Sequence, residues 1–340
     1  MGFPRLIYGT LGLEGLDRTA AARAVHAAID HGFSAFDTAP LYGLGAVEEN
    51  LGHALREQRQ SVSLLSKCGI VWDSEHGEVL FENWLEGRRR IFRKNSRPDS
   101  VRQEVHRSLS RLGVERIDVM QLHQFDAQVP IEETLGALEV LVGEGKLGAI
   151  GVSNFPLAAL RASAAHLRPG SGLACVQDEY SALARAAEGA SLGWAREHGC
   201  PFLAYSPLAQ GLLAGRYLGA AALPSDYRKD TARFAPEARR RLARVLEGPG
   251  TEIAKAAGMT LGQLSLHWLL SRPGVAAVIV GGRSAAQIAE NAGTLQKTAS
   301  GEALAAFDQA LSGAGVVESA GGLRRQLGTK IRDVWAKLRY

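Results

Sequence analysis

The stretch Ala35-Phe36-Asp37-Thr38-Ala39-Pro40-Leu41-Tyr42-Gly43 is a short apolar run that stops at an acidic residue, followed by a loop that carries a tyrosine. Two later stretches repeat this pattern. Leu64-Leu65-Ser66 leads to Lys67, and Val119-Met120-Gln121-Leu122 leads to His123. Short apolar runs of this kind are typical of strands buried in a parallel sheet. In a barrel of such strands the C-terminal ends all face one pocket, so these polar side chains are expected to meet there.

Eight apolar runs alternate with helical patterns along the chain. The predicted strands are residues 6–9, 35–37, 62–66, 117–122, 149–153, 174–177, 202–205 and 277–280. The predicted helices are residues 19–31, 47–56, 100–112, 131–144, 156–165, 192–198, 261–270 and 285–291. Eight strand-helix units predict an α/β fold, a closed (β/α)8 TIM barrel with its active site at the C-terminal strand ends. A doubly wound dinucleotide fold needs Gly-x-Gly-x-x-Gly after the first strand, and Gly9, Gly12 and Gly15 have the wrong spacing.

Asp37, Tyr42, Lys67 and His123 are side chains that carbonyl reduction needs. The reaction delivers a hydride to carbon and a proton to oxygen, and we expect the tyrosine pKa of about 10 to be lowered for proton donation. A Lys67 ammonium would lower the pKa of Tyr42, and an Asp37 carboxylate would keep Lys67 charged. His123 would donate a hydrogen bond to the substrate oxygen. Each residue alone fits an ordinary structural role, but four at successive strand ends favour catalysis.

Seven motifs occur in order along the chain: Asp-Thr-Ala-x-x-Tyr-Gly at 37–43, the Lys67 strand, Gln121-Leu122-His123, Gly151-Val152-Ser153-Asn154-Phe155, Gln177 with Tyr180-Ser181, Ala204-Tyr205-Ser206-Pro207-Leu208 running to Gly211, and Val280-Gly281-Gly282-Arg283-Ser284. With these motifs the chain resembles the aldo-keto reductase family from about residue 6 to residue 295. The resemblance implies an NADPH-dependent reductase in which Tyr42 is the acid, Lys67 and Asp37 tune it, and His123 orients the carbonyl. Where the family often continues with Trp-Pro-Asp after the histidine, this chain has Gln124-Phe125-Asp126, which makes the pocket wall more polar.

The resemblance also implies a site for the cofactor NADP(H). Arg283, next to the free N–H groups of a helix start, matches the site for the adenosine 2′-phosphate, so NADPH is expected over NADH. Ser153, Asn154 and Gln177 match the residues that hold the nicotinamide carboxamide, and Tyr205 matches the aromatic under the ring. Residues 208–234 are expected to act as a lid over the pyrophosphate. The expected cofactor contacts are Thr10, Ser153, Asn154, Gln177, Tyr205, Ser206, Leu208, Gln210, Gly211, Arg216, Gly281, Arg283, Gln287, Glu290 and Asn291.

The composition fits a globular enzyme. Of 340 residues, 46% are hydrophobic and 22% are charged, and the net charge of +4 is too small to indicate nucleic acid binding. Three cysteines without a Cys-x-x-Cys pair favour a reducing cytoplasm over a disulfide framework. Neither zinc-type spacing nor His-Glu-x-x-His occurs, so no metal is expected. No secretory signal and no membrane-length apolar run are found, so we expect a cytoplasmic location. The expected oligomeric state is a monomer or small homo-oligomer.

Two segments do not follow the alternation of strands and helices. Residues 69–95 carry Trp72, Phe81 and Trp84 as expected anchors, and they suit a substrate-shaping loop as well as a plain surface excursion. After a single catalytic domain at 1–312, residues 313–340 combine a glycine-rich joint with a basic amphipathic helix at 323–338. Docking of that helix on the barrel or across a dimer is favoured over binding to a membrane or a partner.

The sequence therefore predicts NADPH-dependent reduction of an aldehyde or ketone, sugar-like or otherwise polar. One alternative is an NADP(H)-binding regulatory subunit on the same barrel with incidental turnover, which the basic tail keeps open. A sugar-phosphate isomerase barrel is disfavoured, because it uses a glutamate base and has no role for Tyr42 with Lys67.

Overall fold

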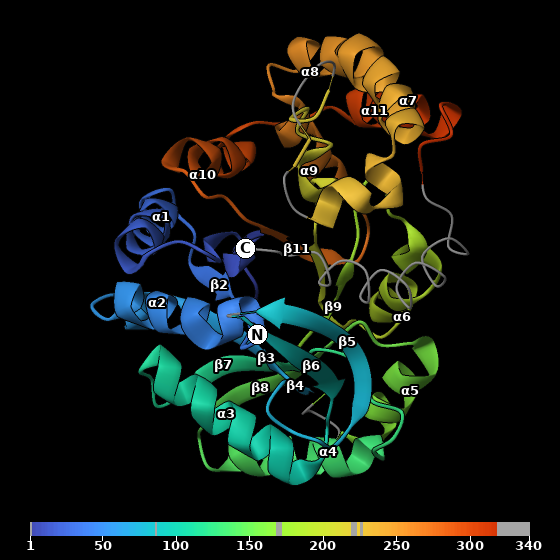
Figure 1. The fold of residues 1–340 in the computed structure, drawn as a ribbon. Helices are drawn as coiled ribbons and strands as arrows, with labels where there is room; N and C mark the ends of the chain where they lie inside the picture. The colour runs from blue at the N-terminus through green and yellow to red at the C-terminus, as the bar shows by residue number, and fades with distance from the viewer. Residues whose placement is uncertain (1, 86, 168–171, 219–222, 225–226, 318–340) are drawn as a thin grey trace.

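The computed structural model describes residues 2–85, 87–167, 172–218, 223–224 and 227–317 (Figure 1). Eight parallel strands close into a barrel in chain order, and the last strand pairs with the first, with Leu6 opposite Val278. The predicted (β/α)8 barrel is therefore confirmed. The barrel strands are β1 (Leu6–Gly9), β2 (Ala35–Asp37), β3 (Ser63–Cys68), β7 (Ile117–Leu122), β8 (Leu147–Ser153), β9 (Val176–Glu179), β10 (Phe202–Tyr205) and β11 (Val275–Val280).

Alternation along these strands divides the apolar side chains between two clusters. One cluster takes alternate strand positions such as Ile7, Leu65 and Val119, which fill the barrel interior. The intervening positions, such as Tyr8 and Leu64, join the larger cluster between strands and helices. The sixth strand was predicted two residues too early, because its pairing with β10 continues to Glu179 opposite Tyr205.

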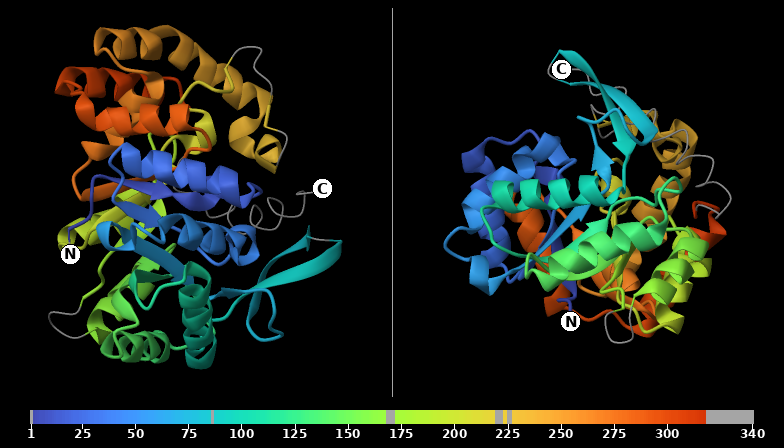
Figure 2. Two further views of the ribbon diagram at one scale, coloured as in Figure 1. Left: turned by 90° about the vertical axis from the view of Figure 1, so that its left-hand side faces the viewer. Right: turned by 90° about the horizontal axis from the view of Figure 1, so that it is seen from below.

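Helices cover the outside of the barrel (Figures 1 and 2). The predicted helices all occur, with ends within a few residues of those expected, and side chains such as Asp17 and Thr260 cap their first turns. The helices are α1 (Arg18–Asp30), α2 (Ala46–Leu55), α3 (Pro98–Leu112), α4 (Ile131–Gly143), α5 (Leu157–His166), α6 (Ser191–Glu197), α7 (Pro236–Val245), α8 (Thr251–Ala256), α9 (Leu261–Leu270), α10 (Ala285–Ala292) and α11 (Gly301–Gly313). Helices α7 and α8, between β10 and β11, had not been predicted, and they lie against α11.

The segment at 69–95 is a small antiparallel sheet that projects from the barrel beside the active-site face (Figure 2). Its strands β4 (Ile70–Val71), β5 (Glu78–Leu85) and β6 (Arg88–Lys94) lie in the order β4-β6-β5. Phe81 and Phe92 stack with ring centroids 4.4 Å apart and pack in one cluster with the loop that carries Tyr42. Trp84 is 62% exposed, so its prediction as an anchor was wrong.

Shorter turns connect these elements. The loop after β10, at 208–234, contains the 3-10 helices Ala209–Gly211, Tyr227–Asp230 and Ala232–Phe234. Others are Thr10–Leu13, Tyr42–Gly45, Arg59–Ser61, Ala186–Gly189 and Gly293–Gln296, and a π turn spans Leu246–Gly250. The predicted tail helix at 323–338 lies outside the described residues.

Candidate active site

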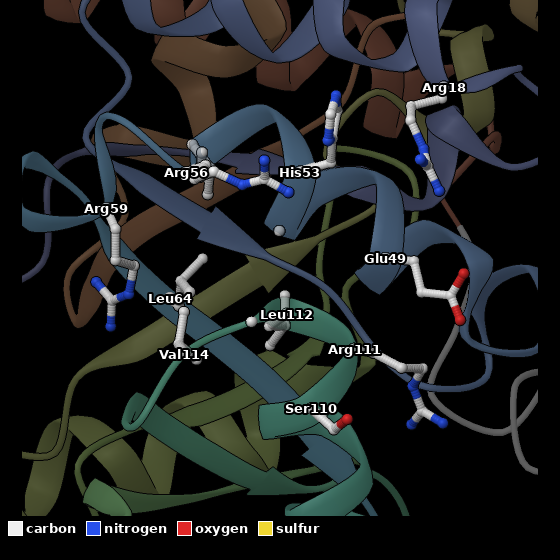
Figure 3. A pocket seen from close by; sticks show the side chains of 13 residues that line it. Arg18, Glu49, His53, Arg56, Arg59, Leu64, Ser110, Arg111, Leu112 and Val114 are labelled. Carbon is white, nitrogen blue, oxygen red and sulfur yellow. The ribbon is translucent and has the colours of Figure 1, made fainter.

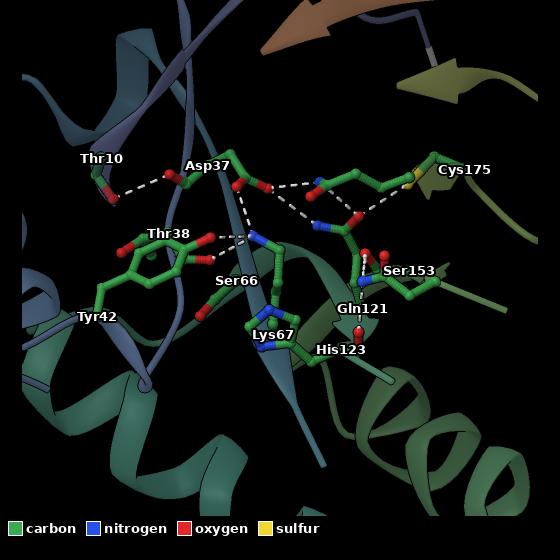
Figure 4. A network of polar contacts seen from close by, with 12 residues as sticks. Thr10, Asp37, Thr38, Tyr42, Ser66, Lys67, Gln121, His123, Ser153 and Cys175 are labelled. Atoms are coloured by element: carbon green, nitrogen blue, oxygen red, sulfur yellow. Dashed lines mark hydrogen bonds and ion pairs between the residues drawn. The ribbon is translucent and has the colours of Figure 1, made fainter. Parts of the chain in front are cut away.

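Lys67 is the centre of a buried polar network at the C-terminal ends of β2, β3 and β7 (Figure 4). Its Nζ lies 2.5 Å from Asp37 Oδ1, 3.0 Å from the Thr38 carbonyl oxygen and 3.4 Å from Tyr42 Oη. The three donors of the ammonium are thus satisfied by a carboxylate, a carbonyl and a phenol. Side-chain exposure of Lys67 and Asp37 is 1% and 3%, so each charge depends on the other for compensation.

Tyr42 has a raised pKa, which corrects the expected lowering. Burial disfavours the phenolate and is the largest influence on the Tyr42 pKa, and it outweighs the lowering by the Lys67 ammonium. Burial also acts to lower the pKa of Lys67, but Asp37 and Tyr42 together leave that pKa raised. At neutral pH the pair is therefore a protonated phenol next to an ammonium, which is the state that can donate a proton.

His123 lies across from the tyrosine. The Tyr42 and His123 rings meet edge to face, with centroids 6.3 Å apart. Burial, and secondly the charge of Lys67, hold the pKa of His123 well below its usual value. The imidazole is therefore neutral at physiological pH and keeps one N–H donor.

A second layer of amides orients Asp37 from the far side. Gln121 Nε2 donates to Asp37 Oδ2 at 3.2 Å, and Gln177 Nε2 donates to the same oxygen at 2.8 Å. The two glutamines also bond one another at 2.9 Å, and Cys175 Sγ lies 3.6 Å from Gln121 Oε1. Gln121 was not among the predicted site residues. The sequence feature that could have indicated it is a polar residue inside an apolar strand. Gln121 also lies two positions before His123, and therefore on the same side of the strand.

Asn154 links the ends of β7, β8 and β10. Its Nδ2 donates to the His123 carbonyl and to Ser153 Oγ, both at 3.0 Å. Tyr205 Oη donates to Asn154 Oδ1 at 2.8 Å. Ser153, Asn154 and Tyr205 therefore lie together next to the His123 strand. Their contact with a nicotinamide stays a prediction. Thr10 reaches the same region, because its Oγ1 donates to the Asp37 carbonyl at 3.0 Å.

Backbone strain is concentrated at this face. Among the described residues, positive φ angles outside glycine occur only at Leu44, Asn154, Ser206, Ala209 and Gln210. All five follow barrel strands, and three lie just after β10, where the Leu208 carbonyl accepts from Gly211 N at 2.9 Å. Strained backbone of this kind tends to cluster at ligand sites.

Arginines near the C-terminal end of the loop at 208–234 contact residues close to the strand ends. Arg233 Nη1 lies 2.7 Å from Glu179 Oε1 at the end of β9, and both side chains are largely buried. Arg228 Nη1 donates to the Gln210 carbonyl at 3.4 Å. Arg216 lies against Gly211, whose φ of 98° suits glycine. The loop is therefore tied to the strand ends at both of its ends.

The end of β11 forms a separate corner with the turn after β1. Arg283 Nε donates to the Gly12 carbonyl at 2.7 Å, and its Nη2 donates to the Glu14 carbonyl at 3.2 Å. Ser284 caps α10, Gln287 Oε1 accepts from Arg283 N at 3.0 Å, and Asn291 Nδ2 donates to the Gly281 carbonyl at 3.1 Å. The Glu290 carbonyl accepts from Gln263 Nε2 at 2.9 Å. The corner thus gathers the residues expected at the 2′-phosphate.

Glu14, which sequence reasoning did not assign, joins this corner to the catalytic loop. Its Oε1 accepts from Gly43 N, the amide after Tyr42, at 3.0 Å. Burial raises the pKa of Glu14, while the Gly43 hydrogen bond and Arg283 act to lower it. A Cβ on Gly281 would meet the Gly9 carbonyl oxygen at 2.8 Å, so the two loops approach more closely than a side chain permits.

Two surface hollows lie away from these residues. One, of about 440 Å³, lies between α2 and α3, and it is lined by the guanidinium groups of Arg18, Arg56, Arg59 and Arg111 (Figure 3). The other, of about 740 Å³, runs along α7. None of the predicted catalytic or cofactor residues lines either hollow.

The described residues form neither a metal cluster nor a membrane-spanning helix. In the described part of the chain, no three His, Cys, Asp or Glu side chains are grouped as a metal site. No helix within the described ranges is long and apolar enough to cross a membrane. The three cysteines are unpaired.

Comparison with known proteins places this geometry in context. The family model described as "Aldo/keto reductase family" matches residues 5–312. The NADH-specific methylglyoxal reductase of Escherichia coli is 33% identical over 284 residues, 82% of this chain and 84% of that protein. The glycerol dehydrogenase of Gluconobacter oxydans superposes with a TM-score of 0.82 at 29% identity, over 93% of both chains. An aldo-keto reductase from Klebsiella pneumoniae in complex with NADPH superposes with a TM-score of 0.68 at 29% identity, over 90% of both chains.

Proposed function

The chain belongs to the aldo/keto reductase family, and from this premise we propose that it reduces an aldehyde or ketone to the alcohol with NADPH, with Tyr42 as general acid. The observation that carries the proposal is the contact of Lys67 Nζ with both Asp37 and Tyr42. A buried ammonium between a carboxylate and a phenol has an evident use when the phenol gives up a proton. It compensates the negative charge that develops on the phenol oxygen.

The residues present fit a phosphorylated dinucleotide. Gly281, after β11, lets its loop approach the loop after β1 closely at Gly9. The exposed guanidinium of Arg283 lies just before the start of α10. The chain after β10 passes through four strained or glycine positions, Ser206, Ala209, Gln210 and Gly211, as it enters the loop at 208–234. We propose that this loop is the lid over the pyrophosphate. When bound, NADPH supplies the hydride for the carbonyl carbon.

The side chains of this chain handle the carbonyl oxygen. Tyr42 donates its proton to that oxygen, and Lys67, held by Asp37, stabilises the phenolate that remains. The neutral His123 donates a second hydrogen bond to the same oxygen and aligns it. Gln121 and Gln177 fix the Asp37 carboxylate, so the ammonium cannot turn away.

The substrate we propose is a small polar carbonyl compound. Gln124 follows His123 at the position where the family often has tryptophan. Its amide favours a substrate with polar groups near the carbonyl. The names of the methylglyoxal reductase and the glycerol dehydrogenase describe small polar compounds, which supports this class. Unpaired cysteines accord with the cytoplasmic location that we propose. For the oligomeric state we propose a monomer or small homo-oligomer.

The test is turnover of a panel of aldehydes and ketones by the purified full chain with NADPH and with NADH. We expect loss of NADPH absorbance with small polar carbonyls, and slower loss with apolar ones. Tight NADPH binding without turnover of any member would instead support the regulatory subunit. Failure to bind either cofactor would refute both functions.

Replacing Arg283 is expected to weaken NADPH selectively. Arg283→Ala should cost about 2 kcal/mol of NADPH affinity, roughly 30-fold in Kd, because a charge-assisted contact to the 2′-phosphate is lost. NADH affinity should hardly change, since NADH has no such phosphate. Binding isotherms for both cofactors test this. Arg240→Ala, on α7 away from the site, is the matched control. Equal losses for both cofactors would move the phosphate site elsewhere.

A further inference from the structure

Glu104 is a buried carboxyl group on α3 that the mechanism above does not use. It is 5% exposed, and both of its oxygens accept a hydrogen bond from Gly69 N, at 3.2 and 3.0 Å. Gly69 is the second residue after Lys67, at the end of β3, and its φ of 91° suits glycine. A buried backbone N–H needs an acceptor, and at this strand end a side chain from a neighbouring helix provides it.

The same peptide group holds the backbone of the catalytic histidine. Between residues 68 and 69, the N–H of Gly69 donates to Glu104, while the carbonyl of Cys68 accepts from His123 N at 2.8 Å. The β3–β7 ladder runs just before it, with Lys67 opposite Gln121 and Cys68 opposite Leu122. One peptide plane therefore connects Glu104 to His123, and it lies one residue after Lys67.

We propose that Glu104 is a positioning residue for the catalytic centre. By fixing the plane of the Cys68–Gly69 peptide, it sets where the His123 ring stands relative to the Lys67–Tyr42 pair. The proposal deepens the reductase function proposed above and rests on it for its effect on rate, although its structural content can be measured without turnover. A shift of the ring by a fraction of an ångström is enough to slow a reaction that depends on alignment.

The surroundings of Glu104 explain why its ionisation affects stability. Burial raises its pKa to about 8. The Gly69 hydrogen bond, Ser100 and Arg107 act to lower that pKa, while Asp73 acts to raise it. Asp73 and Arg107 pair with each other at 2.6 Å near the surface, and the buried Cys68 thiol is the remaining titratable neighbour. The carboxyl is therefore mostly protonated at neutral pH, and either oxygen still accepts from Gly69.

Turnover of Glu104→Ala and Glu104→Gln tests the proposal. We expect Glu104→Ala to lower kcat per NADPH-binding site by about tenfold, with NADPH affinity unchanged. Glu104→Gln should restore most of kcat, because its amide oxygen can accept from Gly69 N. Glu133→Ala, an exposed glutamate on α4, is the matched control and should leave kcat unchanged. If Glu104→Ala lowers only the melting temperature and leaves kcat per site intact, the role is structural and the proposal fails.

Amide hydrogen exchange gives a result that does not depend on turnover. In Glu104→Ala the amides of both Gly69 and His123 should exchange faster, because the peptide plane that joins them is released. Faster exchange at Gly69 alone would overturn the proposal, even in an active protein. If the wild type reduces no carbonyl, the reductase function fails, while this measurement still decides the coupling. Should Glu104→Ala not fold, Glu104→Asp, which withdraws the acceptor by one methylene, takes its place in both measurements.

The pH dependence of stability follows from the same burial. The unfolded chain releases this proton near the ordinary carboxyl pKa of 4.5, and the folded chain near 8. Between these values the folded state binds more protons, so the contribution of Glu104 to stability is complete below about 4.5 and falls as pH rises through about 8. Wild-type melting temperature should therefore decline across this window relative to Glu104→Gln. Parallel curves for the two proteins would show that Glu104 does not titrate there.

Discussion

Tyr42→Phe is expected to reduce turnover by about two orders of magnitude or more, with NADPH affinity nearly unchanged. The substitution keeps the ring, which packs against the cluster of Leu41, Phe81 and Phe92, and removes the hydroxyl that contacts Lys67 at 3.4 Å. Lys67 keeps Asp37 and the Thr38 carbonyl as partners, so the network around it should survive. The loss therefore isolates proton donation from packing and from cofactor binding.

Single-turnover rates with saturating NADPH measure this loss directly. Tyr180→Phe is the matched control, because that hydroxyl donates to Glu188 at 2.7 Å, in a contact separate from the Lys67 network. Its rate should stay close to that of the wild type. A Tyr42→Phe enzyme within a few-fold of the parent would show that another group supplies the proton, and the mechanism would have to be abandoned.

Lys67→Met is expected to damage both turnover and stability. The ammonium is the compensating charge for Asp37, and both groups are almost fully buried. Removing one partner of such a pair leaves an uncompensated buried charge, which typically costs about 3–5 kcal/mol of stability. Turnover should fall at least as far as in Tyr42→Phe, about two orders of magnitude, because the phenolate loses its stabilising cation.

The double variant Asp37→Asn/Lys67→Met separates the two effects. It removes both charges, so urea unfolding should show much of the lost stability restored, while single-turnover rates remain low. The amides of Gln121 and Gln177, which donate to the Asp37 carboxylate, can still donate to the side-chain amide oxygen that the Asp37→Asn change leaves in its place. If Lys67→Met alone were as stable to urea as the wild type, the result would contradict the dependence of each charge on the other.

Local pattern was enough to predict the barrel strands. Each is a short apolar run whose alternate residues are buried on opposite sides, so periodicity along the chain indicates where it lies. Residues at the ends of successive strands must gather at one rim once the barrel closes. For this reason Asp37, Tyr42, Lys67 and His123 could be grouped before any contact between them was known.

The segment at 69–95 shows where local pattern failed. Strands β5 and β6 carry many charged residues, including Arg88-Arg89-Arg90, so they lack a clear apolar alternation. Their pairing, with Asn83 opposite Arg90, becomes visible only when the hairpin folds. Its docking on the Tyr42 loop joins residues from separate parts of the chain, which no short window of sequence contains.

The sequence by itself determined the barrel, the four polar side chains at its rim and the resemblance to a reductase family, because each depends on residue type and spacing along the chain. Only the tertiary structure decided the state of those side chains. The raised pKa of Tyr42 comes from burial by residues distant in sequence, against the lowering that its neighbour Lys67 alone would cause. Gln121, Glu14 and Glu104 act on residues 84, 29 and 35 positions away, respectively. Burial and long-range hydrogen bonds arise from packing, so they exist only once the chain has closed on itself.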